Sequence, residues 1–138
     1  MTPKLQFVDT GLLLTLLGVD AAGVKQERCL LGHILATFVC AELLKHRTMV
    51  EGDYRLLYYR DSDMVEVDLV GKNAAGQPVG VEVKAAASVN PGDLRGLRKL
   101  ASLAGDRFKM GVLFYDGTET LPLGDGLWAA PLSTLWGQ

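Results

Sequence analysis

The segment Glu66–Lys84, EVDLVGKNAAGQPVGVEVK, decides the fold of this chain. Two short runs of alternating residues, 65–70 and 79–85, flank a polar, glycine-containing stretch, which is typical of two strands joined by a loop. In the first run, valine and leucine at 65, 67 and 69 should lie on one face and residues 66, 68 and 70 on the other. Four charged residues stand inside these strands, where apolar residues are the rule: Glu66, Asp68, Glu82 and Lys84.

A hairpin in which residue 71 pairs with residue 79 places Asp68 opposite Glu82 and Glu66 opposite Lys84. Directly opposed side chains have Cβ atoms about 4.5–5.5 Å apart, so the two carboxylates repel unless one is protonated or a cation lies between them. Mg²⁺ or Mn²⁺ would supply that cation, because such ions bind one or two carboxylates with water in the remaining positions. Lys84 would then position or deprotonate an attacking water, or offset charge on a phosphoryl oxygen.

A second interpretation of the same pattern needs no site. Alternating acidic and apolar residues also mark the solvated face of an antiparallel sheet. The predicted Glu66–Lys84 pair would then be an ordinary cross-strand ion pair, worth under about 1 kcal/mol. Spacing alone leaves both interpretations open, and Glu66 is either a substitute metal ligand or the partner of Lys84.

The flanking sequence predicts an α/β fold with a mixed sheet and flanking helices. Helical periodicity covers residues 30–46, and Pro91 and Asp93 mark the start of a later helix that ends at Gly105. The element order is helix, three-strand meander, helix, strand, in which 79–115 forms a parallel strand–helix–strand crossover. Further predicted elements are a strand at 4–8, a helix at 11–18, a loop at 19–28, and strands at 54–60, 108–115 and 127–131 with a last helical turn.

Length and composition indicate one domain with a substantial core. The chain has 138 residues, of which 49% are hydrophobic, and a net charge of −2, which excludes a general basic coat. We expect an N-terminal extension over 1–28 and a core over 29–136. The longest apolar run, GLLLTLLGV, is too short to cross a bilayer, and no signal-peptide pattern frames it. We therefore expect a cytoplasmic protein with no membrane partner.

Five segments carry a resemblance to a known family: FVDTGLLLTLLGV, LLGHILATFVCAELLK, YYRDSDMVEVDLV, GVEVKAAASVNPGDLRGLRKLA and FKMGVLFYDGTETLPLGDGLWAAPLSTLW. Together they resemble the C-terminal domain of unknown function of a large prokaryotic family of AAA+ ATPases, over nearly the whole chain. The strand pattern also resembles the PD-(D/E)XK nuclease superfamily, which has Asp on the second strand and (D/E)-x-K on the third. The resemblance implies a restriction-endonuclease-like fold in which Asp68 and Glu82 hold the metal and Asp68, Glu82 and Lys84 are catalytic.

Two departures from the family pattern bear on activity. Family members carry an N-terminal ATPase module, but this sequence has no G-x-x-x-x-G-K-[ST] loop. We therefore expect that the ATPase module and its ATP site are absent. The chain would then be either a fragment or a stand-alone copy of the domain. Family members also commonly have Glu on the first core helix, where this chain has Ala36. His33 shares that helix face and is an accessory candidate, although a histidine on an apolar helix is more often a core residue.

Surface residues suggest partners. Arg95, Arg98 and Lys99 on the helix after the third strand would hold DNA or RNA phosphates, or would be only a solvated helix face. An exposed GLLLTLLGV would dock an ATPase module or a second copy. We expect Gly96 to permit close helix–sheet packing, and we expect Trp128 and Trp136 to pack at the C-terminus, with an interface role as the alternative.

Two functions follow as hypotheses. The first is a Mg²⁺- or Mn²⁺-dependent phosphodiesterase that cleaves DNA or RNA. The second is a catalytically degenerate nuclease-like module that binds nucleic acid or protein, which the loss of one carboxylate at Ala36 favours. A purely structural remnant is a third, weaker alternative.

Overall fold

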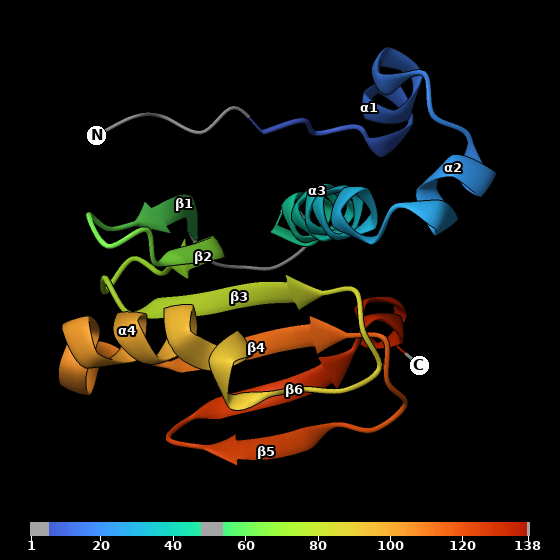
Figure 1. Cartoon of the computed structure of the whole chain (residues 1–138). Coiled ribbons are helices and arrows are strands. Elements are labelled where there is room, and N and C mark those ends of the chain that lie inside the picture. The colour runs from blue at the N-terminus through green and yellow to red at the C-terminus, as the bar shows by residue number, and fades with distance from the viewer. Residues whose placement is uncertain (1–5, 48–53, 138) are drawn as a thin grey trace. The chain divides into compact units, whose positions relative to one another are not determined.

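The computed structural model describes residues 6–47 and 54–137 (Figure 1). The chain forms two compact units, residues 1–50 and 51–138. The first unit is helical: α1 (Thr10–Leu17), α2 (Ala21–Gln26) and α3 (Arg28–Arg47). Of the strand predicted at 4–8, residues 4 and 5 lie outside the described residues, and residues 6–8 form no strand.

The helix predicted at 11–18 is α1, shifted by one residue, and a capping residue lies at each end. The Asp9 side chain caps it by accepting the Leu12 N–H at 2.8 Å, and Gly18 ends it in the left-handed conformation at φ +66°. The loop predicted at 19–28 is wrong, because α2 lies there. Asp20 accepts the Gly23 N–H at 2.8 Å, so a single capping side chain starts a short helix in a weakly periodic stretch.

The apolar side chains of α1 are exposed, and the helix has no buried residue. Leu12, Leu16 and Leu17 are 52%, 66% and 48% exposed. This is the condition that the predicted docking of an ATPase module or a second copy requires, and the docking itself stays a prediction. Among the described residues, α3 is the one helix long and apolar enough to cross a membrane, a test that the core helix of a soluble protein also passes.

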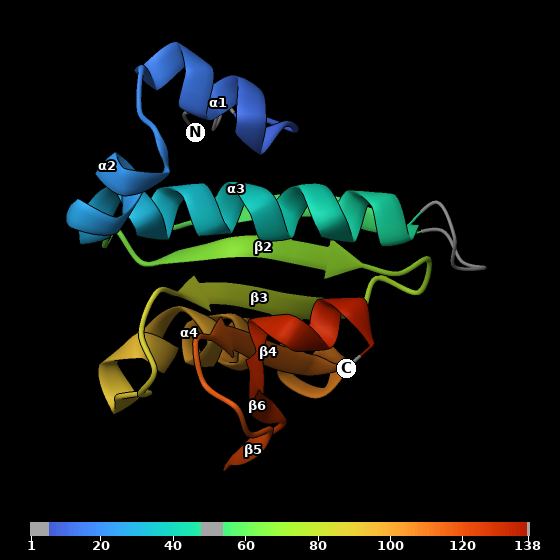
Figure 2. The same cartoon turned by 90° about the vertical axis from the view of Figure 1, so that its right-hand side faces the viewer.

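The second unit is a six-stranded mixed sheet with the order β1-β2-β3-β4-β6-β5 (Figures 1 and 2). The predicted meander and the parallel crossover are confirmed, since β1, β2 and β3 pair antiparallel and β3 pairs parallel with β4. The fold is therefore α/β. The strands are β1 (Arg55–Arg60), β2 (Glu66–Lys72), β3 (Pro78–Lys84), β4 (Met110–Tyr115), β5 (Leu121–Gly124) and β6 (Leu127–Pro131).

Two features of the C-terminal part differ from the sequence prediction. Strand β5 was not predicted; it forms a hairpin with β6 through Gly124, Asp125 and Gly126, which all have positive φ. A Gly-Asp-Gly run is a turn signal that could have revealed it. The packing predicted for Trp128 and Trp136 is only partial, because the two residues are 39% and 53% exposed.

Helix α4 (Arg95–Ala104) lies across one face of this sheet (Figure 1). The hydrophobic core of the second unit lies between this helix and the sheet. The 3-10 turn η1 (Pro91–Leu94) leads into α4 and η2 (Gly105–Arg107) follows it, and a third such turn, η3 (Leu132–Trp136), closes the chain. The buried cluster combines one helix face with three strands: Val67, Val70, Leu94, Leu97, Leu100, Leu113 and Leu127. Burial of these side chains orients the helix, and so decides which strand residues lie at its first turn.

Candidate functional site on strands β2 and β3

The register of the β2–β3 hairpin is the one that the sequence predicted. Gly71 pairs with Val79, and the last pair in the ladder is Leu69 with Val81. The pairing stops one residue before Asp68 and Glu82. There the ladder gives way to a side-chain contact, in which the Val83 N–H donates to Asp68 Oδ2 at 2.9 Å. The Asp68 carboxylate therefore lies against the peptide bond between Glu82 and Val83.

Strand β2 contains a bulge, so the predicted strict alternation of its side chains is wrong. Leu57 pairs with Val70 and Tyr59 with Val67, so a step of two residues along β1 corresponds to a step of three residues along β2. Val67 and Val70 consequently both belong to the cluster beneath α4, although alternation placed them on opposite faces. A bulge inserts one extra residue and changes the direction of the side chains around it. Asp68 lies within this bulge.

The first turn of α4 lies directly on the two strands because residue 96 is glycine. A Cβ atom at Gly96 would be 2.1 Å from the carbonyl oxygen of Glu66 and 2.5 Å from Oε1 of Glu82. The close helix–sheet packing predicted for Gly96 is confirmed. The half-buried Glu82 carboxylate is thus held at the start of a helix, where the N–H groups and the helix dipole favour negative charge.

Lys84 forms an ion pair that the sequence did not predict. Its Nζ contacts Oδ2 of Asp93 in η1, so the predicted Glu66–Lys84 pair is wrong. Asp93 also accepts the Asn90 N–H at 2.6 Å. Burial opposes ionisation of Asp93, but the hydrogen bonds from Lys84 and Asn90 and the Lys84 charge prevail and lower its pKa. The sequence marked Asp93 only as a helix start, because the eight intervening residues hide its approach to Lys84.

Replacing Asp93 by asparagine should destabilise the sheet unit in a pH-dependent way. The pKa of Asp93 is lowered by folding, so its stabilisation is complete above the ordinary value of about 3.9 and disappears as the pH falls through the folded value. We expect Asp93→Asn to lose about 1–2 kcal/mol at pH 7 and much less at pH 3, measured by urea unfolding. The exposed Asp106→Asn is the control; an Asp93→Asn deficit of equal size at both pH values would contradict this assignment.

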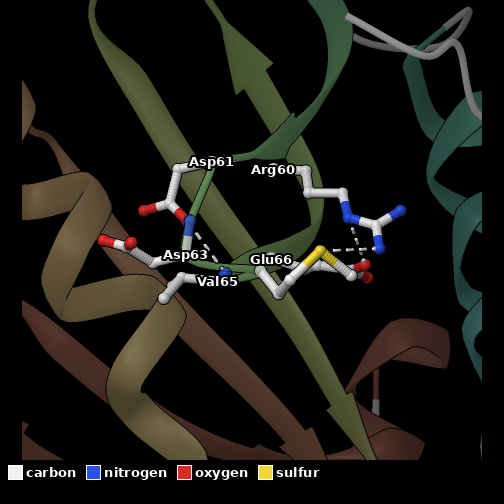
Figure 3. Close-up of polar contacts among 6 residues, drawn as sticks. Arg60, Asp61, Asp63, Val65 and Glu66 are labelled. Carbon is white, nitrogen blue, oxygen red and sulfur yellow. Dashed lines mark hydrogen bonds and ion pairs between the residues drawn. The ribbon is translucent and has the colours of Figure 1, made fainter.

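Glu66 is paired with Arg60 rather than with Lys84 (Figure 3). Arg60 Nε lies 3.1 Å from Glu66 Oε1, and Arg60 Nη2 also donates to Met64 Sδ at 3.2 Å. Burial raises the pKa of Tyr58, and the hydrogen bond and charge of Glu66 raise it further. Both charged side chains of the pair are about 40% exposed, so the pair itself contributes little stability. The role of Glu66 as a substitute metal ligand stays a prediction.

The predicted ligands of a divalent cation are the carboxylates of Asp68 and Glu82. Among residues 6–47 and 54–137, no group of three or more His, Cys, Asp or Glu side chains is placed to hold a metal ion. Asp68 accepts the Val83 N–H through Oδ2, and Glu82 precedes Val83 in β3. Two carboxylates with water would suit Mg²⁺, which usually keeps several waters, and this cation site stays a prediction.

The remaining predicted site residues lie on helices α3 and α4. His33 is exposed on α3 of the first unit and Ala36 is half-buried there, and the accessory role of His33 stays a prediction. Arg95, Arg98 and Lys99 are exposed on α4, whose opposite face is buried. That exposure suits both a phosphate-binding surface and a solvated helix face, so nucleic-acid binding by these three also stays a prediction.

Comparison with known proteins identifies the family. Residues 31–135, which include α4 and the whole sheet, match a family described as Domain of unknown function (DUF4143). Neither curated proteins nor solved structures give a match. Because the match covers well over half of the chain, this protein belongs to the DUF4143 family.

Proposed function

We propose that the sheet unit is a nuclease-like module that hydrolyses a phosphodiester bond in DNA or RNA with a divalent cation held by Asp68 and Glu82. The observation that carries the proposal is the β2–β3 register, with the Asp68 carboxylate on the Val83 N–H next to Glu82. The order α3, β1, β2, β3, α4, β4 is also that of the PD-(D/E)XK core, which supports the resemblance. The cation would neutralise developing phosphoryl charge and lower the pKa of a bound water.

Lys84 would act in this reaction through its charge. Asp93 engages its ammonium group directly, and an ammonium paired with a carboxylate is a poor proton acceptor. Of the roles predicted from sequence, stabilisation of negative charge on a phosphoryl oxygen is therefore favoured over deprotonation of water. Asp93 would be a positioning residue, since it fixes the Lys84 side chain beside the Glu82 strand position.

A second function is favoured by a different observation. The cation site offers two carboxylates rather than three, and Ala36 stands where the family commonly has Glu. A module of this kind would bind nucleic acid or protein without cutting it. Its nucleic-acid binding would weaken as salt rises, because phosphate contacts release counterions.

A cleavage assay separates the two functions. Fluorescently labelled single- and double-stranded DNA and RNA are incubated with the full chain and Mg²⁺ or Mn²⁺, and Mn²⁺ binding is followed by calorimetry. We expect metal-dependent cleavage that falls at least about 100-fold in Glu82→Ala, together with loss of Mn²⁺ binding. Glu119→Ala, an exposed carboxylate in the same unit, should behave like the wild type.

The outcomes are distinct. No cleavage with either metal and no Mn²⁺ binding would refute the phosphodiesterase. Salt-sensitive nucleic-acid binding that survives in Glu82→Ala would then support the second function.

A further inference from the structure

A pocket of about 440 Å³ lies at the edge of the sheet, away from Asp68, Glu82 and Lys84. Helix α4 packs on β2, β3 and β4, so the face of edge strand β1 extends past it and leaves a recess beside the C-terminal half of the helix. The pocket is lined by Leu57, Tyr58, Tyr59, Val70, Lys72, Gly76, Pro78, Leu100, Leu103, Ala104 and Arg107. Its volume is within the range of about 300–1,000 Å³ that is usual for small-molecule sites.

Two cations meet at one end of this pocket, above the β2–β3 turn. Arg107 Nη2 donates to the Gly76 carbonyl at 2.9 Å. A Cβ atom at Gly76 would be 2.3 Å from Arg107 Nη2 and 4.0 Å from Lys72 Cε, so both side chains approach the same point. The β1–β2 register adds a third cation, since Arg55 pairs directly with Lys72.

These cations are not neutralised within the described part of the chain. No acidic side chain is among the described lining residues, and neither Lys72 nor Arg107 forms an ion pair with another described residue. Like charges placed directly opposite in a sheet destabilise it. An anion bound between Lys72 and Arg107 would offset part of the repulsion between Lys72 and Arg55, and a phosphate accepts charge-assisted hydrogen bonds from both side-chain types.

The rest of the pocket is aromatic and apolar. Leu57 and Leu103 are 45% and 61% exposed, and a bound apolar group would cover them. Tyr59 lies on the same face of β1 as Leu57 and packs against the cluster beneath α4, whereas the side chain of Tyr58 points to the opposite face. The Tyr59 hydroxyl donates to Asp61 Oδ2 at 3.5 Å, so Tyr59 offers ring surface, on which a nucleic-acid base can stack.

We propose that this pocket binds a nucleotide, with the phosphate at Lys72 and Arg107 and the base against Leu57, Tyr59 and Leu103. A free nucleotide and an unpaired nucleotide of a single strand share this chemistry. The inference goes beyond the cleavage proposal, because the pocket contains none of the residues assigned to the cation site and needs no metal.

The test is calorimetric titration of the full chain, without divalent cations, with adenosine 5′-monophosphate and with an eight-nucleotide single-stranded DNA. We expect Lys72→Ala and Arg107→Ala to raise the Kd at least tenfold, and Arg107→Lys to restore part of the affinity because it keeps the charge. Tyr59→Leu should weaken binding, whereas Tyr59→Phe, which keeps the ring, should not. Lys25→Ala, an exposed lysine on α2, is the matched control, and circular dichroism checks that each variant is folded.

Each outcome bears on the proposal. Binding of both probes, or of the oligonucleotide alone, with the expected losses would support it and identify the source of the nucleotide. No binding of either probe, or binding that Lys72→Ala and Tyr59→Leu leave unchanged, would overturn it. Because the titration contains no metal, nucleotide binding should persist in Glu82→Ala, so this inference and the cleavage proposal can fail separately.

Discussion

Leu97→Ala is expected to lower the free energy of unfolding of the sheet unit by about 3–5 kcal/mol. Leu97 is completely buried at the centre of the α4–sheet contact. Two strand glycines make room for it: a Cβ atom at Gly80 would lie 2.7 Å from Leu97 Cδ2, and one at Gly111 would lie 3.3 Å from the same atom. Truncation would leave a cavity between helix and sheet that the rigid strand backbone cannot fill.

Urea unfolding followed by far-UV circular dichroism measures this effect. Leu103→Ala is the matched control, since it makes the same change on the same helix at a side chain that is 61% exposed. It should alter stability by no more than about 0.5 kcal/mol. Equal losses for the two substitutions would contradict the placement of Leu97 at the centre of the core.

Gly96→Ala is expected to destabilise the same unit by about 1–3 kcal/mol. Alanine is normally the better helix residue by about 1 kcal/mol, so propensity predicts the opposite sign. The new methyl group would lie 2.1 Å from the Glu66 carbonyl oxygen and 2.5 Å from Glu82 Oε1. A strand carbonyl in the middle of a sheet cannot move aside, so the first turn of α4 must rise from the strands. The Glu82 carboxylate would lose its place at the start of the helix.

The same unfolding experiment applies, with Gly92→Ala as the control. Gly92 precedes α4 in η1, and a Cβ atom there would meet no atom within 4 Å, so its replacement should be nearly neutral. A stabilised Gly96→Ala protein would show that helix propensity outweighs packing at this position.

Much of the fold follows from local pattern. The capped ends of α1, the meander, the crossover and the hairpin register were predicted because capping residues, alternation and a loop of defined length act over a few residues. The elements that were missed or misjudged have weaker local signals. Helix α2 depends on one capping aspartate, and β5 depends on pairing with β6 across a turn of three positive-φ residues.

The candidate site divides in the same way. The register of the β2–β3 hairpin could be derived because it depends on the length of one loop. The partners of Glu66 and Lys84 could not, since Arg60 and Asp93 reach them through the β1–β2 turn and through η1. The bulge in β2 depends on pairing with β1, and the edge pocket depends on how far α4 extends over the sheet. By itself, the sequence determined the element order and the register of this hairpin. Only the tertiary structure decided which cation neutralises each acid and where a cavity remains, because ion pairs and cavities depend on distances between segments that chain connectivity does not set.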